Sequence, residues 1–323
     1  MRRDITILVP GAMHERVLAR LAENFHVLPL DSNDPSAVTP EIAARVRGLA
    51  GGALTIHAGL IDSLPKLEIV AYNGVGYDKV DAKHAATRGV MVTNTPDVLT
   101  EEVADTALGL LINTVREFPR AENWLREGRW ETEGPYRLTP GTLRGRKVGI
   151  FGMGRIGQAI ARRIAALDLP VSYHNRRPVE GSPYAYHDTL EGLAGAVDTL
   201  IDVAPSTPET EKAVDARIFE ALGPSGVFVN IGRGTTMDEP ALIEALEKGT
   251  IQAAGLDVFE KEPHVPARLL ALPNAVLLPH VGSASVWTRN AMADLVVDNL
   301  VSWFDAGKAL TLVPETRRVK ARG

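Results

Sequence analysis

Residues 152–157 read Gly-Met-Gly-Arg-Ile-Gly, and this stretch suggests a dinucleotide-binding turn. Three glycines at this spacing let a strand turn tightly into a helix and bring backbone N–H groups against a pyrophosphate. Residues 147–151 form a short apolar strand pattern before the glycines, and residues 169–173 form another after a stretch of helical periodicity. This context predicts a dinucleotide-binding βαβ unit, whereas an isolated glycine motif would also fit an ordinary turn.

The residues after the second strand indicate which dinucleotide binds. An acidic side chain at this strand end would hydrogen-bond the adenosine ribose hydroxyls of NAD. The chain instead has Asn175, Arg176 and Arg177 there. Two arginines match the 2′-phosphate of NADP, so we expect NADP (NADPH) as cofactor, with NAD as a weaker alternative.

Composition excludes several other classes of protein. The chain has 323 residues, enough for two domains, and its net charge of −5 with no basic stripe argues against a nucleic-acid partner. It contains no cysteine, which excludes disulfides, thiolate metal sites and cysteine nucleophiles. No apolar stretch approaches the roughly 20 residues of a membrane span. We expect a cytoplasmic protein with no membrane partner and no metal.

Strand and helix patterns alternate along most of the chain, which predicts parallel sheets covered on both faces. In the first hundred residues the strand patterns lie at 5–9, 25–30, 67–72 and 90–92, with a helical pattern around Ile42 and Val46. A long helix is expected after Thr100 and another at about 284–304. Six further strand patterns fit a doubly wound dinucleotide fold: 147–151, 169–173, 199–203, 227–231, 254–258 and 275–278.

Residues 120–142 form an aromatic-rich segment with little regular period, containing Trp124, Trp130 and Tyr136. Such a segment either packs on another subunit or folds back on its own domain, and the sequence leaves both alternatives open.

Polar side chains follow three of the predicted strands in the second half of the chain. Arg233 lies between two glycines after 227–231, and its planar guanidinium suits a carboxylate. Glu262 follows 254–258, and His280 follows 275–278 with a glycine two residues later. Histidine suits proton exchange near neutral pH, and a hydrogen bond that His280 donates to the Glu262 carboxylate would favour the imidazolium form. Six of the other seven histidines lack a partnered motif or metal-like spacing, and His174 lies beside the second strand of the cofactor unit.

Several spaced motifs, in this order, resemble the D-isomer-specific 2-hydroxyacid dehydrogenase family almost from end to end. They are Asn73-Gly74-Val75-Gly76-Tyr77-Asp78, residues 152–157, Val229-Asn230-Ile231-Gly232-Arg233-Gly234, Gly255-Leu256-Asp257-Val258-Phe259 with Glu262-Pro263, and Pro279-His280-Val281-Gly282-Ser283. Within the family the chain is most similar to NADP-dependent glyoxylate/hydroxypyruvate reductases, because of the arginine pair.

The resemblance implies a role for each site residue. Arg233, Glu262 and His280 form the implied catalytic set. The backbone of Val75 and Gly76, with Leu54 nearby, joins Arg233 and His280 in binding the substrate, and Asp257 holds the nicotinamide carboxamide. The implied cofactor-binding set is Gly152, Gly154, Arg155, Ile156, Gly157, Asn175, Arg176, Arg177, Ala204, Pro205, Thr210, Ile231, Arg233, Asp257, His280 and Gly282.

The expected fold class is therefore α/β, with two doubly wound parallel-sheet domains. A flavodoxin-like substrate domain comprises residues 1–99 and 288–323, and a Rossmann-type dinucleotide-binding domain comprises 100–287. The resemblance also implies a homodimer, with the excursion at about 120–142 in the interface and Trp130 reaching the partner's site. The expected activity is reduction of a small 2-keto acid, glyoxylate or hydroxypyruvate. Two alternatives are a family member acting on a bulkier 2-keto acid, such as an aromatic pyruvate, and a non-catalytic dinucleotide sensor on the same fold.

Overall fold

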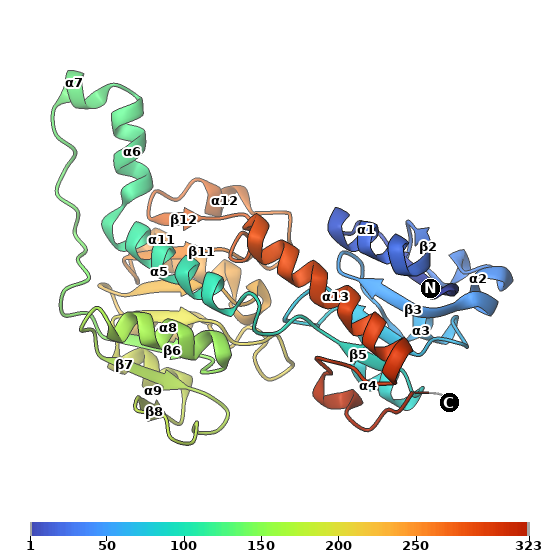
Figure 1. The fold of residues 1–323 in the computed structure, drawn as a ribbon. Coiled ribbons are helices and arrows are strands. Elements are labelled where there is room, and N and C mark those ends of the chain that lie inside the picture. Colours follow the sequence, from blue (N-terminus) through green and yellow to red (C-terminus); the bar gives the residue numbers. More distant parts are fainter. Residues whose placement is uncertain (1, 322–323) are drawn as a thin grey trace. The chain divides into compact units, whose positions relative to one another are not determined.

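The computed structural model describes residues 2–321, which fall into two compact units (Figure 1). One unit consists of Met1–Leu99 with Ser285–Gly323 and the other of Thr100–Ala284. Met1, Arg322 and Gly323, which belong to the expected first domain, lie outside the described residues. The units divide after residues 99 and 284, whereas the expected domain boundaries lie after 99 and 287.

Five parallel strands form the sheet of the first unit in the order β2-β1-β3-β4-β5, which is the 2-1-3-4-5 order of flavodoxin-like folds. The strands are β1 Arg2–Pro10, β2 Phe25–Leu30, β3 Val46–Gly51, β4 Ile69–Tyr72 and β5 Met91–Thr93. The helices are α1 Glu15–Asn24, η1 Pro35–Ala37, α2 Pro40–Arg45, α3 Ala58–Asp62, α4 Ala82–Thr87, α13 Val286–Ala306 and η3 Pro314–Thr316. The prediction of one helical pattern through Ile42 and Val46 is wrong, because α2 ends at Arg45 and Val46 begins β3.

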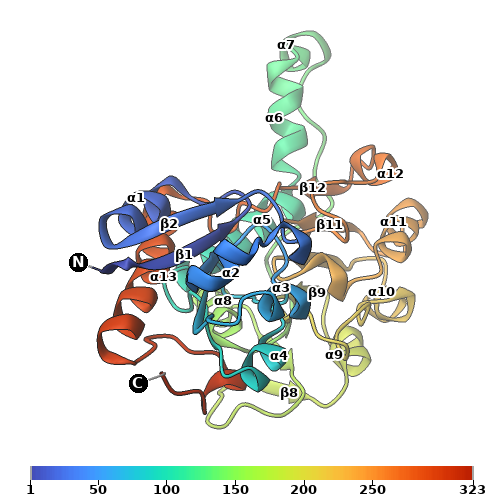
Figure 2. The ribbon, with the colours of Figure 1, turned by 90° about the vertical axis from the view of Figure 1, so that its right-hand side faces the viewer.

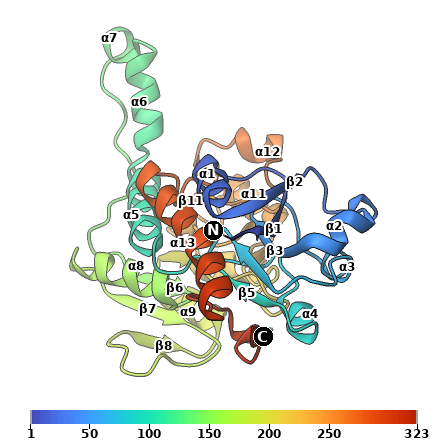
Figure 3. The same ribbon diagram turned by 45° about the vertical axis from the view of Figure 1, so that its right-hand side comes forward.

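Alternate side chains of these strands enter two separate cores, as a sheet buried on both faces requires. Ile7 packs with α1 and α13 in one core, and Leu8 packs with α3 and α4 in the other. Helices α1 and α13 lie side by side (Figure 3). Arg16 of α1 pairs with Asp294 of α13 at 2.7 Å.

Seven parallel strands form the sheet of the second unit in the order β12-β11-β10-β9-β6-β7-β8. Counted from β6, this is the Rossmann order extended by one strand, so the expected fold class is confirmed. The strands are β6 Val148–Phe151, β7 Val171–His174, β8 Ala185–His187, β9 Thr199–Asp202, β10 Val227–Asn230, β11 Ala253–Leu256 and β12 Ala275–Leu277. Six of these strands match predicted strand patterns, and the edge strand β8 has no predicted counterpart.

Helices cover both faces of this sheet (Figure 2). Leu193, Phe219 and Leu246, from three helices on one face, share a core with the strands. On the other face, a Cβ on Gly255 of β11 would lie 2.9 Å from Leu110. The helices are α5 Thr100–Arg116, α8 Arg155–Ala165, α9 Leu190–Ala196, α10 Ala216–Leu222, η2 Gly234–Thr236, α11 Glu239–Lys248 and α12 Ala267–Leu270.

Helices α6 Phe118–Arg126 and α7 Arg129–Glu133 form an arm that stands clear of the rest of the second unit (Figures 1 and 2). The expectation of little regular structure at 120–142 is wrong for the part that lies in these two helices, whereas residues 134–142 carry no helix or strand. The arm packs on itself, since Trp124 Nε1 donates to the Gly134 carbonyl at 3.1 Å and the Arg129 guanidinium lies 3.7 Å from the Trp124 ring centroid.

Candidate active site

The glycine loop joins β6 to α8 with little room to spare. Gly152 has a φ of +101°, a backbone conformation that favours glycine. A Cβ on Gly157 would lie 2.1 Å from the Gly152 carbonyl oxygen, so only glycine allows the helix to approach the strand this closely. Beside Gly154 the space is open, since a Cβ there would meet no atom within 4 Å. A tight turn with open space before the first turn of α8 fits the pyrophosphate of a dinucleotide.

Asn175 connects this loop to the end of β7. Its Oδ1 accepts a hydrogen bond from the Met153 N–H at 3.0 Å, and its carbonyl accepts one from the Tyr186 hydroxyl at 3.2 Å. Arg176 and Arg177 follow at the surface, and within residues 2–321 neither is paired with a carboxylate. Two guanidinium groups are thus left at the end of β7 for an anionic ligand.

The turn that carries Arg233 is fixed by its two glycines. A Cβ on Gly232 would lie 3.0 Å from the Ala204 carbonyl oxygen, and one on Gly234 would lie 1.9 Å from the Phe259 carbonyl carbon. The Arg233 turn therefore fills the space between the loops that follow β9 and β11. It lies directly against the segment that leads to Glu262.

Glu262 and His280 form a hydrogen-bonded pair. His280 Nδ1 lies 2.7 Å from Glu262 Oε2, and the other carboxylate oxygen accepts the Phe259 N–H at 3.1 Å. Burial raises the pKa of Glu262, but His280, the Phe259 N–H and the charge of Arg233 together outweigh it and leave this pKa below its ordinary value. An ionised Glu262 orients the imidazole through Nδ1 and leaves Nε2 for a substrate. The structure thus brings Arg233, Glu262 and His280 together.

His280 also has a constrained backbone, with a φ of +55°. Non-glycine residues in this region are often found at functional sites. Its conformation is held by Asp257, whose carboxylate accepts the N–H groups of Val281 and Gly282 at 2.7 and 2.8 Å. Burial raises the pKa of Asp257, although these two hydrogen bonds act in the opposite direction. Asp257 therefore supports the turn of His280, and its expected role toward a carboxamide stays a prediction.

The other expected cofactor residues of this unit lie at neighbouring strand ends. Ala204 and Pro205 follow β9, and the Thr210 hydroxyl donates to the Pro205 carbonyl at 2.6 Å. Ile231 follows β10, and a Cβ on Gly282 would lie 3.3 Å from it. These positions share the carboxyl edge of the sheet, where ligands bind in doubly wound folds.

Leu54, Val75 and Gly76 belong to the first unit, where they follow the adjacent strands β3 and β4. The Val75 carbonyl accepts the side-chain amide of Asn94 at 2.8 Å, which fixes this loop. These three residues lie at the carboxyl edge of their own sheet.

Sequence reasoning missed two buried acids that support the site. Asp202 ends β9 with none of its surface exposed, and Glu239 in α11 accepts the Glu260 N–H at 3.2 Å. The sequence gives one signal for Asp202, an acid in the otherwise apolar run Leu200-Ile201-Asp202-Val203.

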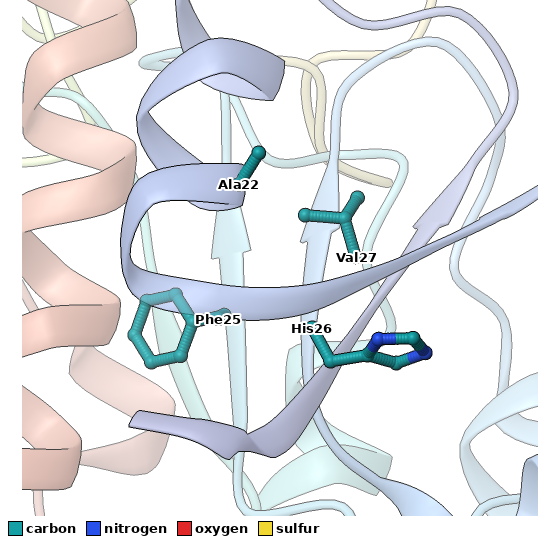
Figure 4. A pocket seen from close by; sticks show the side chains of 4 residues that line it. All are labelled: Ala22, Phe25, His26 and Val27. Carbon is teal, nitrogen blue, oxygen red and sulfur yellow. The ribbon is translucent and has the colours of Figure 1, made fainter. Parts of the chain in front are cut away.

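A hollow at the edge strand β2 of the first unit is lined by Ala22, Phe25, His26 and Val27 (Figure 4). The Phe25 ring packs against Phe304 at a centroid distance of 5.9 Å, and His26 is exposed. His26 is the one titratable side chain lining it, so we assign the hollow no chemistry. In residues 2–321 no group of three or more His, Cys, Asp or Glu could hold a metal ion. Among the helices of the same range, none is both long enough and apolar enough to cross a membrane.

A glycine loop in a doubly wound fold, with a proton donor at the strand ends, is typical of enzymes that move a hydride to or from a dinucleotide, and this chain has both features. The family sequence model for the NAD-binding domain of D-isomer specific 2-hydroxyacid dehydrogenases matches residues 108–282. The chain belongs to the D-isomer specific 2-hydroxyacid dehydrogenase family.

Relatives along the whole chain agree with this assignment. A hydroxyphenylpyruvate reductase of Plectranthus scutellarioides is 47% identical over 84% of this chain and 86% of its own length. A glyoxylate/hydroxypyruvate reductase of Arabidopsis thaliana is 43% identical over 96% of this chain and 99% of its own length. The crystal structure of an NADPH-dependent glyoxylate/hydroxypyruvate reductase from Sinorhizobium meliloti, in complex with NADP and malonate, has a TM-score of 0.95 and 56% identity, covering 99% of both chains.

Proposed function

We propose that this protein reduces a small 2-keto acid, glyoxylate or hydroxypyruvate, to the 2-hydroxy acid with NADPH. The 2.7 Å hydrogen bond between His280 and Glu262 supports a reduction that needs a proton donor. The similarity to the Sinorhizobium meliloti reductase supports this choice of substrate and cofactor. The intact set of Arg233, Glu262 and His280 argues against the alternative of a non-catalytic sensor, which has no use for a proton donor.

In the proposed reaction His280 supplies the proton. The nicotinamide, when bound, supplies the hydride that forms the new C–H bond at the carbonyl carbon. Protonated His280 donates from Nε2 to the carbonyl oxygen, which becomes the hydroxyl, and the neutral ring then takes a proton from solvent. Glu262 remains ionised and stabilises the imidazolium through Nδ1. In the reverse direction neutral His280 accepts the hydroxyl proton.

We assign the substrate carboxylate to Arg233. Its planar guanidinium can donate two parallel hydrogen bonds to a carboxylate, which fixes the orientation of the keto group as well as the charge. The backbone N–H groups of Val75 and Gly76, with Leu54 nearby, are the further carboxylate-binding groups in this proposal.

The cofactor assignment follows the chemistry of the loops. Gly152, Gly154, Arg155, Ile156 and Gly157 would bind the pyrophosphate, for which the open space at Gly154 provides room. Asn175, Arg176 and Arg177 would bind the adenosine ribose and its 2′-phosphate. The nicotinamide end is assigned to Ala204, Pro205, Thr210, Ile231, Asp257 and Gly282.

A steady-state comparison of glyoxylate, hydroxypyruvate, pyruvate and phenylpyruvate, each with NADPH and with NADH, tests the proposal. We expect the highest kcat/KM with glyoxylate or hydroxypyruvate and NADPH. The similarity to a hydroxyphenylpyruvate reductase is the reason to include an aromatic 2-keto acid as the alternative substrate. A higher kcat/KM with phenylpyruvate than with glyoxylate or hydroxypyruvate would favour that alternative. No turnover of any of the four would contradict the proposed function.

Replacing both Arg176 and Arg177 by alanine should reduce the preference for NADPH. A hydrogen bond to a charged group contributes about 1.5–3 kcal/mol, so losing one corresponds to roughly ten- to hundredfold. We expect the ratio of kcat/KM with NADPH to that with NADH to fall by this factor. A variant with Arg217→Ala and Arg268→Ala removes two exposed arginines elsewhere in the unit and should keep the ratio. An unchanged ratio in the Arg176/Arg177 variant would exclude this cofactor assignment.

We also propose that the protein is a cytoplasmic homodimer joined through the arm of α6 and α7. The arm supports this because its apolar side chains are exposed in the single chain: Leu125 is 54% and Trp130 60% exposed, and Leu138 in the segment that returns to the sheet is 95% exposed. Such a projecting apolar surface is typical of an interface between subunits. The implied approach of Trp130 to the partner's site is part of the same proposal.

Charges on the arm should separate the subunits. Light scattering should give the mass of two chains for the unmodified protein and of one chain for the variant with Leu125→Glu and Trp130→Glu, because buried unpaired charges are strongly unfavourable. The control is Leu270→Glu, which puts a charge at a similarly exposed apolar position outside the arm and should leave the dimer intact. A monomeric unmodified protein would contradict the proposal.

A further inference from the structure

Beneath the Arg233 turn lies a buried polar chain that the reaction itself does not use. The Thr236 hydroxyl oxygen is 2.6 Å from Asp202 Oδ2 and 2.6 Å from the Arg233 carbonyl oxygen. Asp202, Thr236 and Asn230 have no exposed surface. The other oxygen of Asp202 accepts the Ala204 N–H at 3.0 Å.

Counting donors shows which way these hydrogen bonds run. A hydroxyl group has one proton, and a carbonyl oxygen can only accept. If Thr236 donates its proton to an ionised Asp202, no proton remains between the Thr236 hydroxyl oxygen and the Arg233 carbonyl oxygen, which lie 2.6 Å apart. If Asp202 carries the proton, it donates to Thr236, and Thr236 donates to Arg233. Only the second arrangement supplies a proton to both short contacts.

We propose that Asp202 is held as a neutral acid that donates to Thr236, and that this chain of hydrogen bonds positions the backbone of Arg233. The inference rests on the proposed function where it concerns the substrate, because Arg233 is the residue that is positioned. Asp202 is a positioning residue, since it acts through Thr236 and touches neither substrate nor cofactor.

The surroundings of Asp202 favour the neutral form. The strand neighbours at its level are Phe151 on β6 and Asn230 on β10, and neither titrates. The charged residue of η2 is Arg233 at its N-cap, whose guanidinium donates to the Gly232 carbonyl at 2.9 Å. Burial raises the pKa of Asp202 to about 7, against the opposing effect of its hydrogen bonds with the Thr236 hydroxyl and the Ala204 N–H.

The turn above Asp202 is anchored at one further point. Asn230 donates through Nδ2 to the same Arg233 carbonyl at 3.0 Å and accepts the Gly232 N–H at 3.0 Å. The Arg233 carbonyl therefore accepts from Asn230 Nδ2, from the Thr236 hydroxyl and, at 3.3 Å, from the Thr236 N–H. Removing the hydroxyl bond, which is the shortest of the three at 2.6 Å, should loosen the position of this carbonyl.

Two substitutions of Asp202 distinguish whether the site requires a neutral acid or a charged carboxylate. In Asp202→Asn the amide can donate to Thr236 and accept from Ala204, as the protonated acid does, so kcat and KM should stay near those of the unmodified enzyme. Asp202→Ala removes both bonds. We expect its kcat/KM for the 2-keto acid to fall by up to about a hundredfold, the effect of a small misplacement of a binding group, with KM for NADPH nearly unchanged. An equal loss in Asp202→Asn and Asp202→Ala would show that the negative charge is required and would overturn the proposal.

Thr236 offers a second pair of variants at the next link. Thr236→Val keeps the shape and removes the hydroxyl, so it should behave as Asp202→Ala. Thr236→Ser keeps the hydroxyl and should restore activity. Failure of Thr236→Ser to do so while Thr236→Val is also impaired would assign the effect to packing and overturn the positioning role.

Measurements without substrate test the protonation state directly, so a failure of the proposed function can be told apart from a failure of this inference. Infrared difference spectra of the unmodified protein against Asp202→Asn, below pH 7, should contain the carbonyl stretch of a protonated carboxyl group. Its absence would overturn the proposal. Because the pKa of Asp202 is raised in the folded state, the stability it contributes is lost as pH rises from about 4 through about 7. The unmodified protein should therefore lose stability over this range relative to Asp202→Asn, and parallel stability curves would contradict a neutral Asp202.

Discussion

Replacing His280 by alanine should lower kcat by about 10²- to 10⁴-fold, which is the usual contribution of a positioned general acid or base. Alanine cannot donate the proton that the carbonyl oxygen requires, whereas the glycine loop and the arginine pair are untouched. NADPH affinity, measured by fluorescence titration, should therefore remain nearly unchanged. The matched control is His26→Ala, which removes an exposed histidine from the hollow at β2 and should leave kcat unaltered.

Glu262→Gln refines this test. Glutamine can still accept a hydrogen bond from His280 Nδ1, but it no longer provides the negative charge that favours the imidazolium. We expect a smaller loss of kcat than in His280→Ala. Full turnover in His280→Ala would remove His280 from the mechanism.

The second large effect is expected for Arg233→Ala. Two hydrogen bonds to a charged carboxylate contribute about 1.5–3 kcal/mol each, so kcat/KM for the 2-keto acid should fall by roughly 10²- to 10⁴-fold. KM should rise, because the carboxylate is bound before the reaction as well as during it. Initial-rate measurements at saturating NADPH would show the effect.

Arg233→Lys is the informative partner of this variant. Lysine keeps the positive charge but cannot form the paired hydrogen bonds of a guanidinium, so it should recover only part of the lost kcat/KM. Arg217→Ala, at an exposed arginine that pairs with Asp215, should have no effect. If Arg233→Ala kept its KM and kcat, the substrate carboxylate would have to bind elsewhere.

Much of the fold could be predicted because its signals are local. The strands on either side of the glycine loop are short apolar runs. The loop requires glycine for steric reasons, and the spacing of its glycines is visible in the sequence. Arg233, Glu262 and His280 were found because they follow predicted strands, and the ends of parallel strands meet at one edge of a sheet.

Other elements depend on the tertiary environment and could not be predicted. Strand β3 reads Val-Arg-Gly-Leu-Ala-Gly, with two glycines and low strand propensity, and it is a strand because β1 and β4 pair with it on both sides. Strand β8 has three residues at the edge of its sheet. The arm helices present exposed apolar side chains, so no buried stripe revealed their period.

Asp202 shows the same limit within the site. Its position in an apolar strand marks it as unusual, but its partner Thr236 is 34 residues away and meets it only after β9 and β10 have paired. A buried acid and a buried hydroxyl in separate segments carry no spacing signal.

The hydrogen bond from Met153 to Asn175 has a consequence for redesign of the enzyme. Position 175 belongs to the scaffold of the glycine loop, whereas positions 176 and 177 project from it with exposed side chains. On the proposed cofactor assignment we therefore expect substitutions of the two arginines alone to change cofactor preference, whereas libraries that also randomise Asn175 would disturb the glycine loop at the same time.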